Sequence, residues 1–306
     1  MIDFLKYRYI CAIISLGIIG LFIGTYAYKK YTYGSAFTYS IDFTGGTQVL
    51  FKFEKPIALV DLKNILEHQG YNRAVLRQFS NNEILVRVPE FSNDAQGLAT
   101  KMVASVQSDL PDNNVSILQN EAVGAGVGKE LWWKSLQAIL YALIAMLCYI
   151  AIRFRSFAFG MGAVVALAHD AIIMLGVFLL LDREISITVI GAILAVLGYS
   201  VNDTIVIFSQ IRQNMKKMSG MPIDQIVNVS INQTLRRTIL TSVSTMLTVL
   251  AMFIFGGEVL RDFSLALLIG IIFGTYSSIY IASPVMMAFL GKRDQKDIRR
   301  PAPISS

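Results

Sequence analysis

Six long apolar segments constrain this sequence more than any other feature. They cover about residues 10–28, 132–152, 159–181, 185–208, 238–255 and 263–290. A helix needs roughly 20 mostly apolar residues to cross the hydrocarbon core of a bilayer. Charged residues make up 16% of the chain, whereas soluble domains contain about 25%. The sequence therefore predicts a membrane protein with an all-α bundle of six transmembrane helices over 132–290 and the first segment.

The first segment lacks an A-x-A cleavage site after it, so residues 1–30 are expected to be a short N-terminal segment and an uncleaved anchor helix. With six spans, the N-terminus, the loops after the second and fourth spans, and the tail 291–306 share one side. That side holds fourteen lysines and arginines: Lys6, Arg8, Arg153, Arg155, Arg212, Lys216, Lys217, Arg236, Arg237, Lys292, Arg293, Lys296, Arg299 and Arg300. The opposite short loops hold Arg183 and Arg261.

Because short cytoplasmic loops are enriched in Lys and Arg, we expect both termini in the cytoplasm. The net charge of +6 then reflects this bias and gives no argument for nucleic-acid binding.

Residues 31–131 are polar and are expected on the extracytoplasmic side. Alternation in 47–54 predicts a strand with Val49, Phe51 and Phe53 on one face. A helix pattern follows at 58–70, strand patterns at 73–79 and 83–88, a second helix pattern at 94–109 and a last strand pattern at 114–123. The order β-α-β-β-α-β predicts a ferredoxin-like α+β domain with both helices on one face of an antiparallel sheet.

No cluster of His and Cys, catalytic triad or pair of carboxylates is recognisable in this polar region, so we expect a binding or lever module. We predict that the chain is not an enzyme and has no metal site or cofactor. The stretch "VGAGVGKELWWKS" (123–135) fails the phosphate-loop pattern because Val123 replaces the first glycine and Glu130 the Ser or Thr. We interpret it as a flexible hinge, with Trp132 and Trp133 at the bilayer interface.

Three ionisable side chains lie well inside the apolar segments: His169, Asp170 and Asp203. An ionised group in hydrocarbon costs several kcal/mol or more, so such a residue indicates a functional site. Arg237 precedes the fifth segment at a depth similar to that of Asp203, which predicts that the two side chains meet. The alternative to a functional role for this pair is a purely structural ion pair.

Low dielectric favours the neutral form of an acid, whereas a nearby guanidinium favours the carboxylate. A site where the two effects nearly cancel can load a proton on one side of the membrane and release it on the other. We therefore predict a proton-coupling site made of Asp203, Arg237, Asp170 and His169, with the neighbouring Asn202 and Tyr199.

Small and polar residues recur every three or four positions in four segments, which predicts a polar seam between closely packed helices. The predicted interior stripes are Gly162, Ala166 and Asp170; Gly191, Ala195, Gly198 and Asn202; Arg237, Thr241, Ser244 and Thr248; and Gly270, Gly274, Ser278 and Ala282.

Four motifs, "SIDFTGGTQV", "ALAHD", "GYSVNDTIVIFSQIRQN" and "NQTLRRTILTS", resemble the SecF family over essentially the whole chain. This family is the smaller membrane subunit of the SecD–SecF complex, an accessory to the Sec protein-export channel in the resistance-nodulation-division superfamily. The resemblance assigns the family's intramembrane acids to Asp203 and Asp170 and its arginine to Arg237.

The same resemblance assigns Asp42, Gly45 and Gly46 to a D-F-x-G-G element, a structural hinge in which the glycines permit a sharp turn. The chain departs from the family at Ala125, where the family has proline. The resemblance to the SecF family further implies a multi-pass protein of the bacterial cytoplasmic (inner) membrane. Together with SecD, such a protein uses the proton-motive force to drive late preprotein translocation.

The implied partners are a SecD-like subunit, the Sec translocon channel, the preprotein and membrane lipid, which the basic segment 209–237 can contact. Sodium would also suit an acid lined by hydroxyls. Two alternative functions are a half-transporter that exports a lipid or small molecule, and a structural scaffold of the translocase.

Overall fold

A computed structural model describes residues 1–71, 73–78, 80, 82–91, 94–218 and 220–291. The predicted tail 291–306 lies outside this part of the chain except for Gly291. The fold divides into a helical unit, Met1–Thr38 with Gln137–Ser306, and a sheet unit, Tyr39–Leu136.

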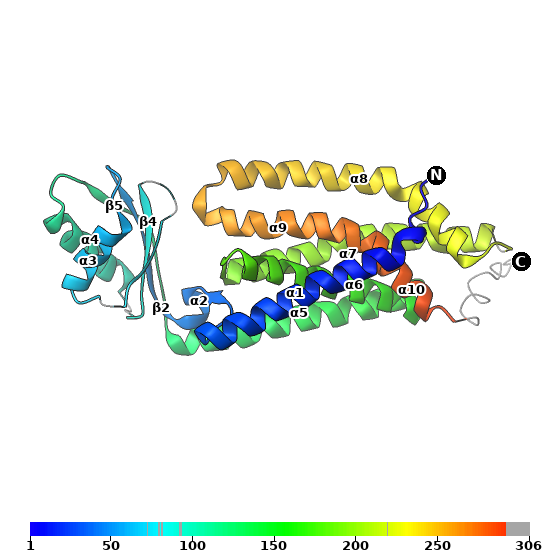
Figure 1. The fold of residues 1–306 in the computed structure, drawn as a ribbon, viewed down its shortest axis with the longest axis horizontal. Helices are drawn as coiled ribbons and strands as arrows, with labels where there is room; N and C mark the ends of the chain where they lie inside the picture. The colour runs from blue at the N-terminus through cyan, green and yellow to red at the C-terminus, as the bar shows by residue number, and fades with distance from the viewer. Residues whose placement is uncertain (72, 79, 81, 92–93, 219, 292–306) are drawn as a thin grey trace, which may run out of the picture. The chain divides into compact units, whose positions relative to one another are not determined.

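Long helices make up the helical unit (Figure 1). A short 3₁₀ turn, Leu5–Tyr7, leads into α1 (Arg8–Tyr33). The others are α5 (Ala125–Phe154), α6 (Phe157–Leu180), α7 (Ile187–Lys217), α8 (Ile223–Phe255), α9 (Gly257–Ser277) and α10 (Ser283–Phe289), with a π-helix, Ser278–Ala282, between the last two. Among the described residues, six helical stretches are long and apolar enough to cross a membrane, as the sequence predicts.

Three of these stretches form the packed centre of the unit. The apolar windows of α6, α7 and the stretch Leu260–Phe289 are 61%, 56% and 56% buried, against 11%, 11% and 17% in α1, α5 and α8. Helix α9 packs against α6, α7 and α8. The centre therefore consists of α6, α7 and α9–α10, while α1, α5 and α8 leave most of their apolar surface for lipid or partner proteins.

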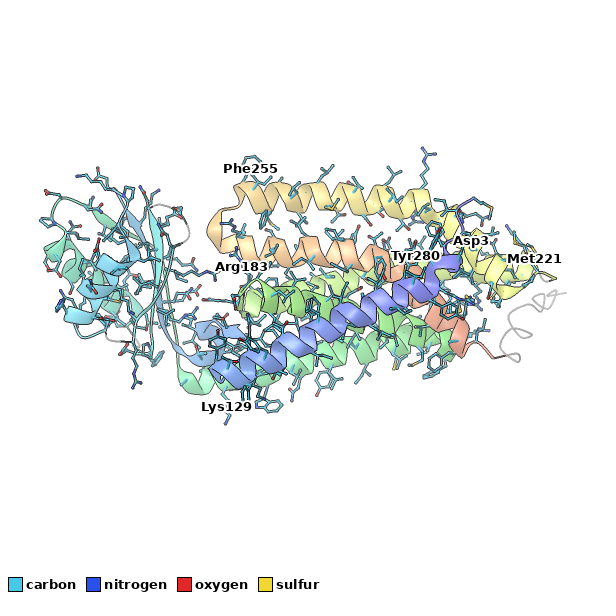
Figure 2. The ribbon with its side chains drawn as sticks, viewed as in Figure 1. Asp3, Lys129, Arg183, Met221, Phe255 and Tyr280 are labelled. Atoms are coloured by element: carbon cyan, nitrogen blue, oxygen red, sulfur yellow. The ribbon has the colours of Figure 1, made fainter. Side chains whose placement is uncertain are left out.

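The two ends of the helical unit are distinct in Figure 2, where Asp3, Met221 and Tyr280 lie at one end and Arg183 and Phe255 at the other. At the first end the N-terminal segment is fastened to α8, outside the predicted fifth apolar segment. Asn232 Oδ1 accepts from the backbone N–H of Ile2 at 2.9 Å, and Asn228 Oδ1 accepts from that of Phe4 at 2.9 Å.

The predicted flexible hinge at 123–135 is wrong, because helix α5 begins at Ala125 and runs through this stretch without a break. One of its glycines, Gly128, lies at a close backbone contact. A Cβ atom added at Gly128 would lie 2.9 Å from the backbone oxygen of Phe43. Glu130 and Lys134, one helical turn apart, form an ion pair of 2.6 Å. The backbone hydrogen bonds of a helix outweigh the conformational freedom of its glycines here.

The sheet unit contains an antiparallel sheet with the strand order β3-β4-β2-β5. Its elements are β2 (Gly46–Phe53), α3 (Leu59–His68), β3 (Val75–Gln78), β4 (Glu83–Val88), α4 (Ala95–Asp109) and β5 (Val115–Val123). Short elements β1 (Thr38–Tyr39), α2 (Ile41–Thr44) and β6 (Glu184–Ile185) complete the described part of the chain. The order β-α-β-β-α-β is the predicted one.

One hydrophobic core holds the sheet unit together. The predicted face of β2, Val49, Phe51 and Phe53, is buried in one cluster with Leu62 and Leu66 of α3. Helix α4 and strand β4 contribute to the same cluster, so both helices cover one face of the sheet, as predicted. Each of these large side chains stabilises the unit by about 1.5–3 kcal/mol through removal of apolar surface from water.

The turn before β2 depends on its two glycines. Gly45 has a φ of 76° and Gly46 a φ of 116°, a region that L side chains rarely adopt. A Cβ atom at Gly46 would also lie 2.5 Å from the backbone oxygen of Val88. Asp42 lies in α2, just before this turn, and its Oδ2 accepts a hydrogen bond of 2.9 Å from the Ser40 hydroxyl.

Candidate functional site

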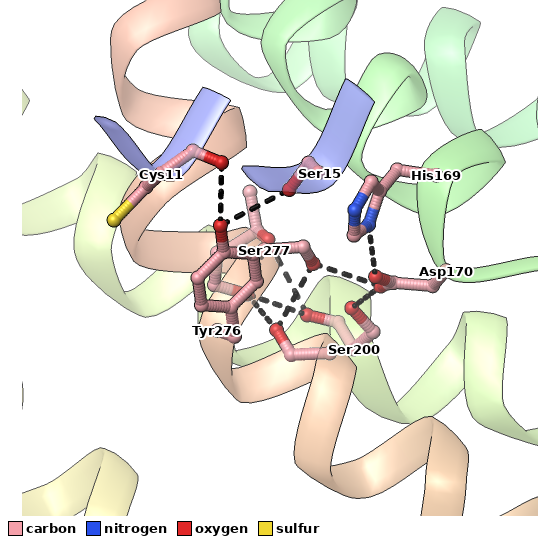
Figure 3. Close-up of polar contacts among 10 residues, drawn as sticks. Cys11, Ser15, His169, Asp170, Ser200, Tyr276 and Ser277 are labelled. Atoms are coloured by element: carbon pink, nitrogen blue, oxygen red, sulfur yellow. Dashed lines mark hydrogen bonds and ion pairs between the residues drawn. The ribbon is translucent and has the colours of Figure 1, made fainter. Parts of the chain in front are cut away.

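Among the described residues of the helical unit, the most deeply buried acid is Asp170, in the middle of α6, with 0% of its surface exposed. Its Oδ2 atom accepts hydrogen bonds from the hydroxyl of Ser200 on α7, at 2.7 Å, and from that of Ser277 at the end of α9, at 2.9 Å. Figure 3 shows the three side chains converging from three helices. Both hydroxyls meet the same oxygen, so the Asp170 side chain joins α6 to α7 and α9.

His169 extends the cluster in the opposite direction. Its Nδ1 atom lies 3.2 Å from Asp170 Oδ1, and its ring lies 6.1 Å from that of Tyr276. The Tyr276 hydroxyl in turn lies 3.0 Å from that of Ser15 and donates to the backbone oxygen of Cys11 at 2.9 Å. His169 Nε2 is buried and has no hydrogen-bond partner among the described residues. On the His169 side, the cluster therefore ends at a buried ring nitrogen that can still form one hydrogen bond.

Asp203, on α7, is the second buried acid, with 3% of its surface exposed. Its Oδ2 atom accepts a hydrogen bond of 3.3 Å from the hydroxyl of Ser242 on α8. Ser242 also lies 2.8 Å, oxygen to oxygen, from Thr275 on α9. Asp203 is therefore held at the junction of α7, α8 and α9.

Arg237 and Asp203 do not form the predicted direct ion pair, since no nitrogen–oxygen distance within 4 Å joins these two described residues. Arg237 attracts the carboxylate over a longer distance, and its side chain is exposed on the outer face of α8. The structure places Ser242 against the acid instead, because Ser242 lies on the face of α8 that packs on α7.

The predicted interior stripe of α7 is also wrong. Gly191, Ala195, Gly198 and Asn202 are all exposed, whereas Ala192, Val196, Ser200 and Asp203 are buried. Of the predicted stripe on α8, Arg237, Ser244 and Thr248 are exposed and Thr241 is half-buried. Tyr199 is half-buried, and its hydroxyl has no hydrogen-bond partner among the described residues.

The stripes predicted on α6 and on the sixth span do lie at helix contacts. A Cβ atom added at Gly162 would lie 2.6 Å from the backbone oxygen of Ala282, and one added at Gly270 would lie 2.4 Å from Val196. Next to Gly274, the hydroxyl of Ser278 lies 3.0 Å from that of Thr204 on α7. The absence of side chains at these glycines lets the three central helices approach closely enough to exchange hydroxyl contacts.

A π-helix begins where the sixth span meets Asp170. Ser277 donates to the acid, and the π-helix starts at the next residue, Ser278. Pro284 follows it and cannot donate a backbone hydrogen bond. π-helical turns are rare and occur frequently at functional sites.

The sequence patterns did not reveal the hydroxyl partners of the two acids, Ser200, Ser277 and Ser242, or Thr275 behind Ser242. A signal existed for Ser200, which is three residues before Asp203 and on the same face of α7. Ser277 carried no signal beyond its position next to the predicted stripe residue Ser278. Among the described residues, no group of three or more His, Cys, Asp or Glu side chains lies close enough together to hold a metal ion.

Asp170 and Asp203 are buried acids, and each is bonded to hydroxyls of neighbouring apolar helices. This arrangement identifies the broad class of protein to which the chain belongs. The chain is a multi-pass membrane protein with an intramembrane acid network at the contact of its three central helices.

The family follows from the sequence. The family described as protein export membrane protein SecD/SecF, C-terminal, matches residues 102–292, and the SecD/SecF GG motif matches residues 35–57. The chain belongs to the SecD/SecF family, so the resemblance stated from its motifs is confirmed.

Relatives and a solved structure agree with this assignment. The chain is 37% identical over 294 residues to protein translocase subunit SecF of Thermodesulfovibrio yellowstonii, covering 95% of each protein. It is 39% identical to protein translocase subunit SecDF of Thermus thermophilus, covering 87% of this chain and 36% of that protein.

The crystal structure of SecDF from Thermus thermophilus, described as a translocon-associated membrane protein, is similar with a TM-score of 0.81 and 38% identity. The match covers 94% of this chain and 38% of that one. The chain thus spans little more than a third of its SecDF relatives and nearly the whole of its SecF relative.

Proposed function

We propose that this chain is an accessory subunit of the Sec protein-export machinery in the bacterial inner membrane, where it works with a SecD-like subunit. Its relatives are named translocase subunits SecF and SecDF. The observation that carries the energetic part of the proposal is the pair of buried acids, Asp170 and Asp203, each with hydroxyl partners on other helices. We propose that these acids take up and release the protons that drive late preprotein translocation.

The geometry supports a mechanism in which protonation loosens helix contacts. A carboxylate at Asp203 attracts Arg237 and accepts from Ser242, both on α8. Protonation removes the charge, so the attraction is lost and the hydrogen bond weakens to that of a neutral pair. Helices α7 and α8 are then free to shift. One charge that moves through the membrane potential supplies about 2.3 kcal/mol per 100 mV, which matches the cost of breaking a contact of this kind.

Buried polar atoms without partners support a proton route to these acids. His169 Nε2, Tyr199 Oη and Thr238 Oγ1 have no hydrogen-bond partner among the described residues. Buried polar groups are rarely left unpaired, and water is an ordinary partner at such positions. In this proposal His169 passes protons to and from Asp170, and Tyr199 and Thr238 line the approach to Asp203.

The exposed polar face of α7 and α8 supports the partner. Asn202 and Arg237 are exposed in the isolated chain although they lie at the depth of apolar segments. A charged or amide side chain that faces acyl chains is costly, so such residues face protein or a watery cavity. We propose that the SecD-like subunit covers this face, which also presents the small residues Gly191, Ala195 and Gly198.

The orientation and the sheet unit complete the proposal. The excess of Lys and Arg supports cytoplasmic termini, and the segment 31–131 then lies outside the cytoplasm. The strand order β3-β4-β2-β5 and the two helices on one face support a ferredoxin-like domain. We propose that this domain acts on the preprotein, with Asp42, Gly45 and Gly46 as its hinge, and that the chain has no enzymatic role.

The test is preprotein export into vesicles that contain this chain and its SecD-like partner, under an imposed pH or sodium gradient. Asp203→Asn should abolish the stimulation of export by the gradient, because the amide cannot cycle between charged and neutral forms. Asp112→Asn, at an exposed acid of the sheet unit, is the matched control and should leave stimulation intact. If Asp203→Asn complexes assemble normally and stimulation by the gradient is unchanged, the proton-coupling role is wrong and the chain is a structural scaffold.

A further inference from the structure

A pocket of three basic residues lies at the end of α5 and α7, apart from the acid network. It has a volume of about 330 Å³ and is lined by Arg153, Phe154, Ser209, Arg212, Gln213 and Lys216. No carboxylate of the described residues lines it. None of its three basic residues forms an ion pair with an acid among the described residues. Three basic side chains thus line one pocket, and no acid in the described part of the chain balances their charge.

One lining residue of the pocket, Phe154, belongs to an aromatic cluster that joins three helices. Phe154 of α5 stacks on Phe159 of α6 with ring centroids 5.1 Å apart and meets Phe208 of α7 edge to face at 6.1 Å. Across the pocket, Arg212 donates to the backbone oxygen of Arg153 at 3.3 Å. The basic groups are therefore held together by the fold, whereas free cations would move apart.

The position of the pocket fits a lipid. Arg153 directly follows the second apolar segment, and Arg212 lies four residues after the fourth. In the last two turns of α5, Tyr149 and Ile152 are 53% and 76% exposed, which offers apolar surface to acyl chains close to Arg153. Basic pockets between transmembrane helices at a membrane surface bind the head groups of acidic phospholipids.

We propose that this pocket binds the phosphate of an anionic phospholipid, with Arg212 and Lys216 as its principal contacts and Arg153 as the third. A bound phosphate relieves the repulsion among the cations and fastens the ends of α5 and α7 to each other. The site is independent of the proton-coupling proposal, because neither Asp170 nor Asp203 takes part in it.

The test compares lipid retention by the purified chain after reconstitution into vesicles of phosphatidylcholine with 10–30% phosphatidylglycerol (roughly the acidic fraction that gives a negative surface). Native mass spectrometry counts the lipids that stay bound. The double variant R212Q/K216Q should weaken retention of phosphatidylglycerol roughly 100-fold, since each hydrogen bond from a basic side chain to the charged phosphate contributes about tenfold or more.

The matched control is K217Q/R236Q, which removes two charges from exposed residues outside the pocket and should leave retention unchanged. An equal loss in both double variants would overturn the proposal in favour of diffuse attraction. Retention of phosphatidylcholine as strong as that of phosphatidylglycerol in the wild type would also overturn it.

Inorganic phosphate and glycerol 3-phosphate are added in separate experiments to identify the source of the phosphate group. Millimolar amounts of either should fail to displace the lipid, and displacement would show a site for a soluble anion instead. Because Arg212 also bonds to α5, K216Q alone is measured as well. It should lower retention about tenfold while the thermal unfolding midpoint stays at the wild-type value.

Discussion

Removal of the hydroxyls around Asp170 provides the most direct test of the buried network. Ser200→Ala and Ser277→Ala each delete one hydrogen bond to the same oxygen, Oδ2, of 2.7 Å and 2.9 Å. A hydrogen bond to a charged group contributes about 1.5–3 kcal/mol to the free energy of unfolding, against about 0.5–1.5 kcal/mol for a neutral pair. Each single variant should therefore lose about 1.5–3 kcal/mol if Asp170 is a carboxylate.

The double variant should lose more than the sum of the single losses. After the first substitution one hydroxyl still bonds to Oδ2, whereas after both this oxygen is buried without either donor. Neighbouring residues in one network couple by about 0.5–3 kcal/mol, so we expect a total loss of about 4–7 kcal/mol.

The measurement is reversible denaturation with sodium dodecyl sulfate in mixed micelles. Thr248→Ala is the control, because this exposed hydroxyl bonds to its own helix, and it should change the unfolding free energy by less than about 0.5 kcal/mol. Asp170→Asn in the double-variant background should recover part of the stability, since an amide is cheaper to bury than an unpaired carboxylate. A double variant that loses less than about 1 kcal/mol would refute the inference that these two hydroxyls hold the Asp170 side chain.

Three further predictions concern packing. Gly46→Ala should destabilise the sheet unit by about 2–4 kcal/mol in hydrogen-exchange measurements, because its φ is 116° and a Cβ atom would lie 2.5 Å from a backbone oxygen of β4. Gly70→Ala, with a φ of 93° but no atom within 4 Å, should cost about 1–2 kcal/mol, and equal costs would contradict the steric argument. Gly162→Ala should cost about 1–3 kcal/mol in detergent denaturation, since a Cβ atom would lie 2.6 Å from a backbone oxygen of the π-helix. Gly198→Ala, with open space around it in the isolated chain, should be neutral within about 0.5 kcal/mol, and a larger loss would show that its face is packed within one chain. Phe154→Ala should lose about 3–5 kcal/mol and expose the end of α5 to proteolysis, and wild-type protease resistance would count against the aromatic cluster as its attachment.

The interior faces of the helices show where prediction from periodicity succeeds and where it fails. On α6 and the sixth span, the stripes that contain Gly162 and Gly274 do lie at helix contacts. On α7 the stripe of Gly191 and Asn202 is exposed. Small residues mark close helix approach, but they do not say whether the approaching helix belongs to the same chain or to another.

The acids show a related limit. Burial of Asp170 and Asp203 follows from their place in apolar segments. An acid that faces acyl chains is costly, so such a side chain faces the interior of the helix bundle. The hydrogen-bond partners of these two acids do not follow from the sequence. Ser200, Ser242 and Ser277 are ordinary residues of membrane helices, and the rotation of each helix about its axis decides which of them meets an acid.

The amino-acid sequence alone determined the number of membrane-spanning segments, the order of elements in the sheet unit and the presence of acids in the membrane. Each of these depends on local composition or on a short-range repeat. Both are set by the transfer of apolar residues out of water and by the need of the backbone for hydrogen bonds. The tertiary structure decided the face that each helix buries, the choice of Ser242 over Arg237 as the nearest partner of Asp203, and the convergence of Arg153, Arg212 and Lys216. These depend on contacts between residues far apart in the chain, and inside a bilayer no difference in hydrophobicity between lipid and protein interior fixes them in advance.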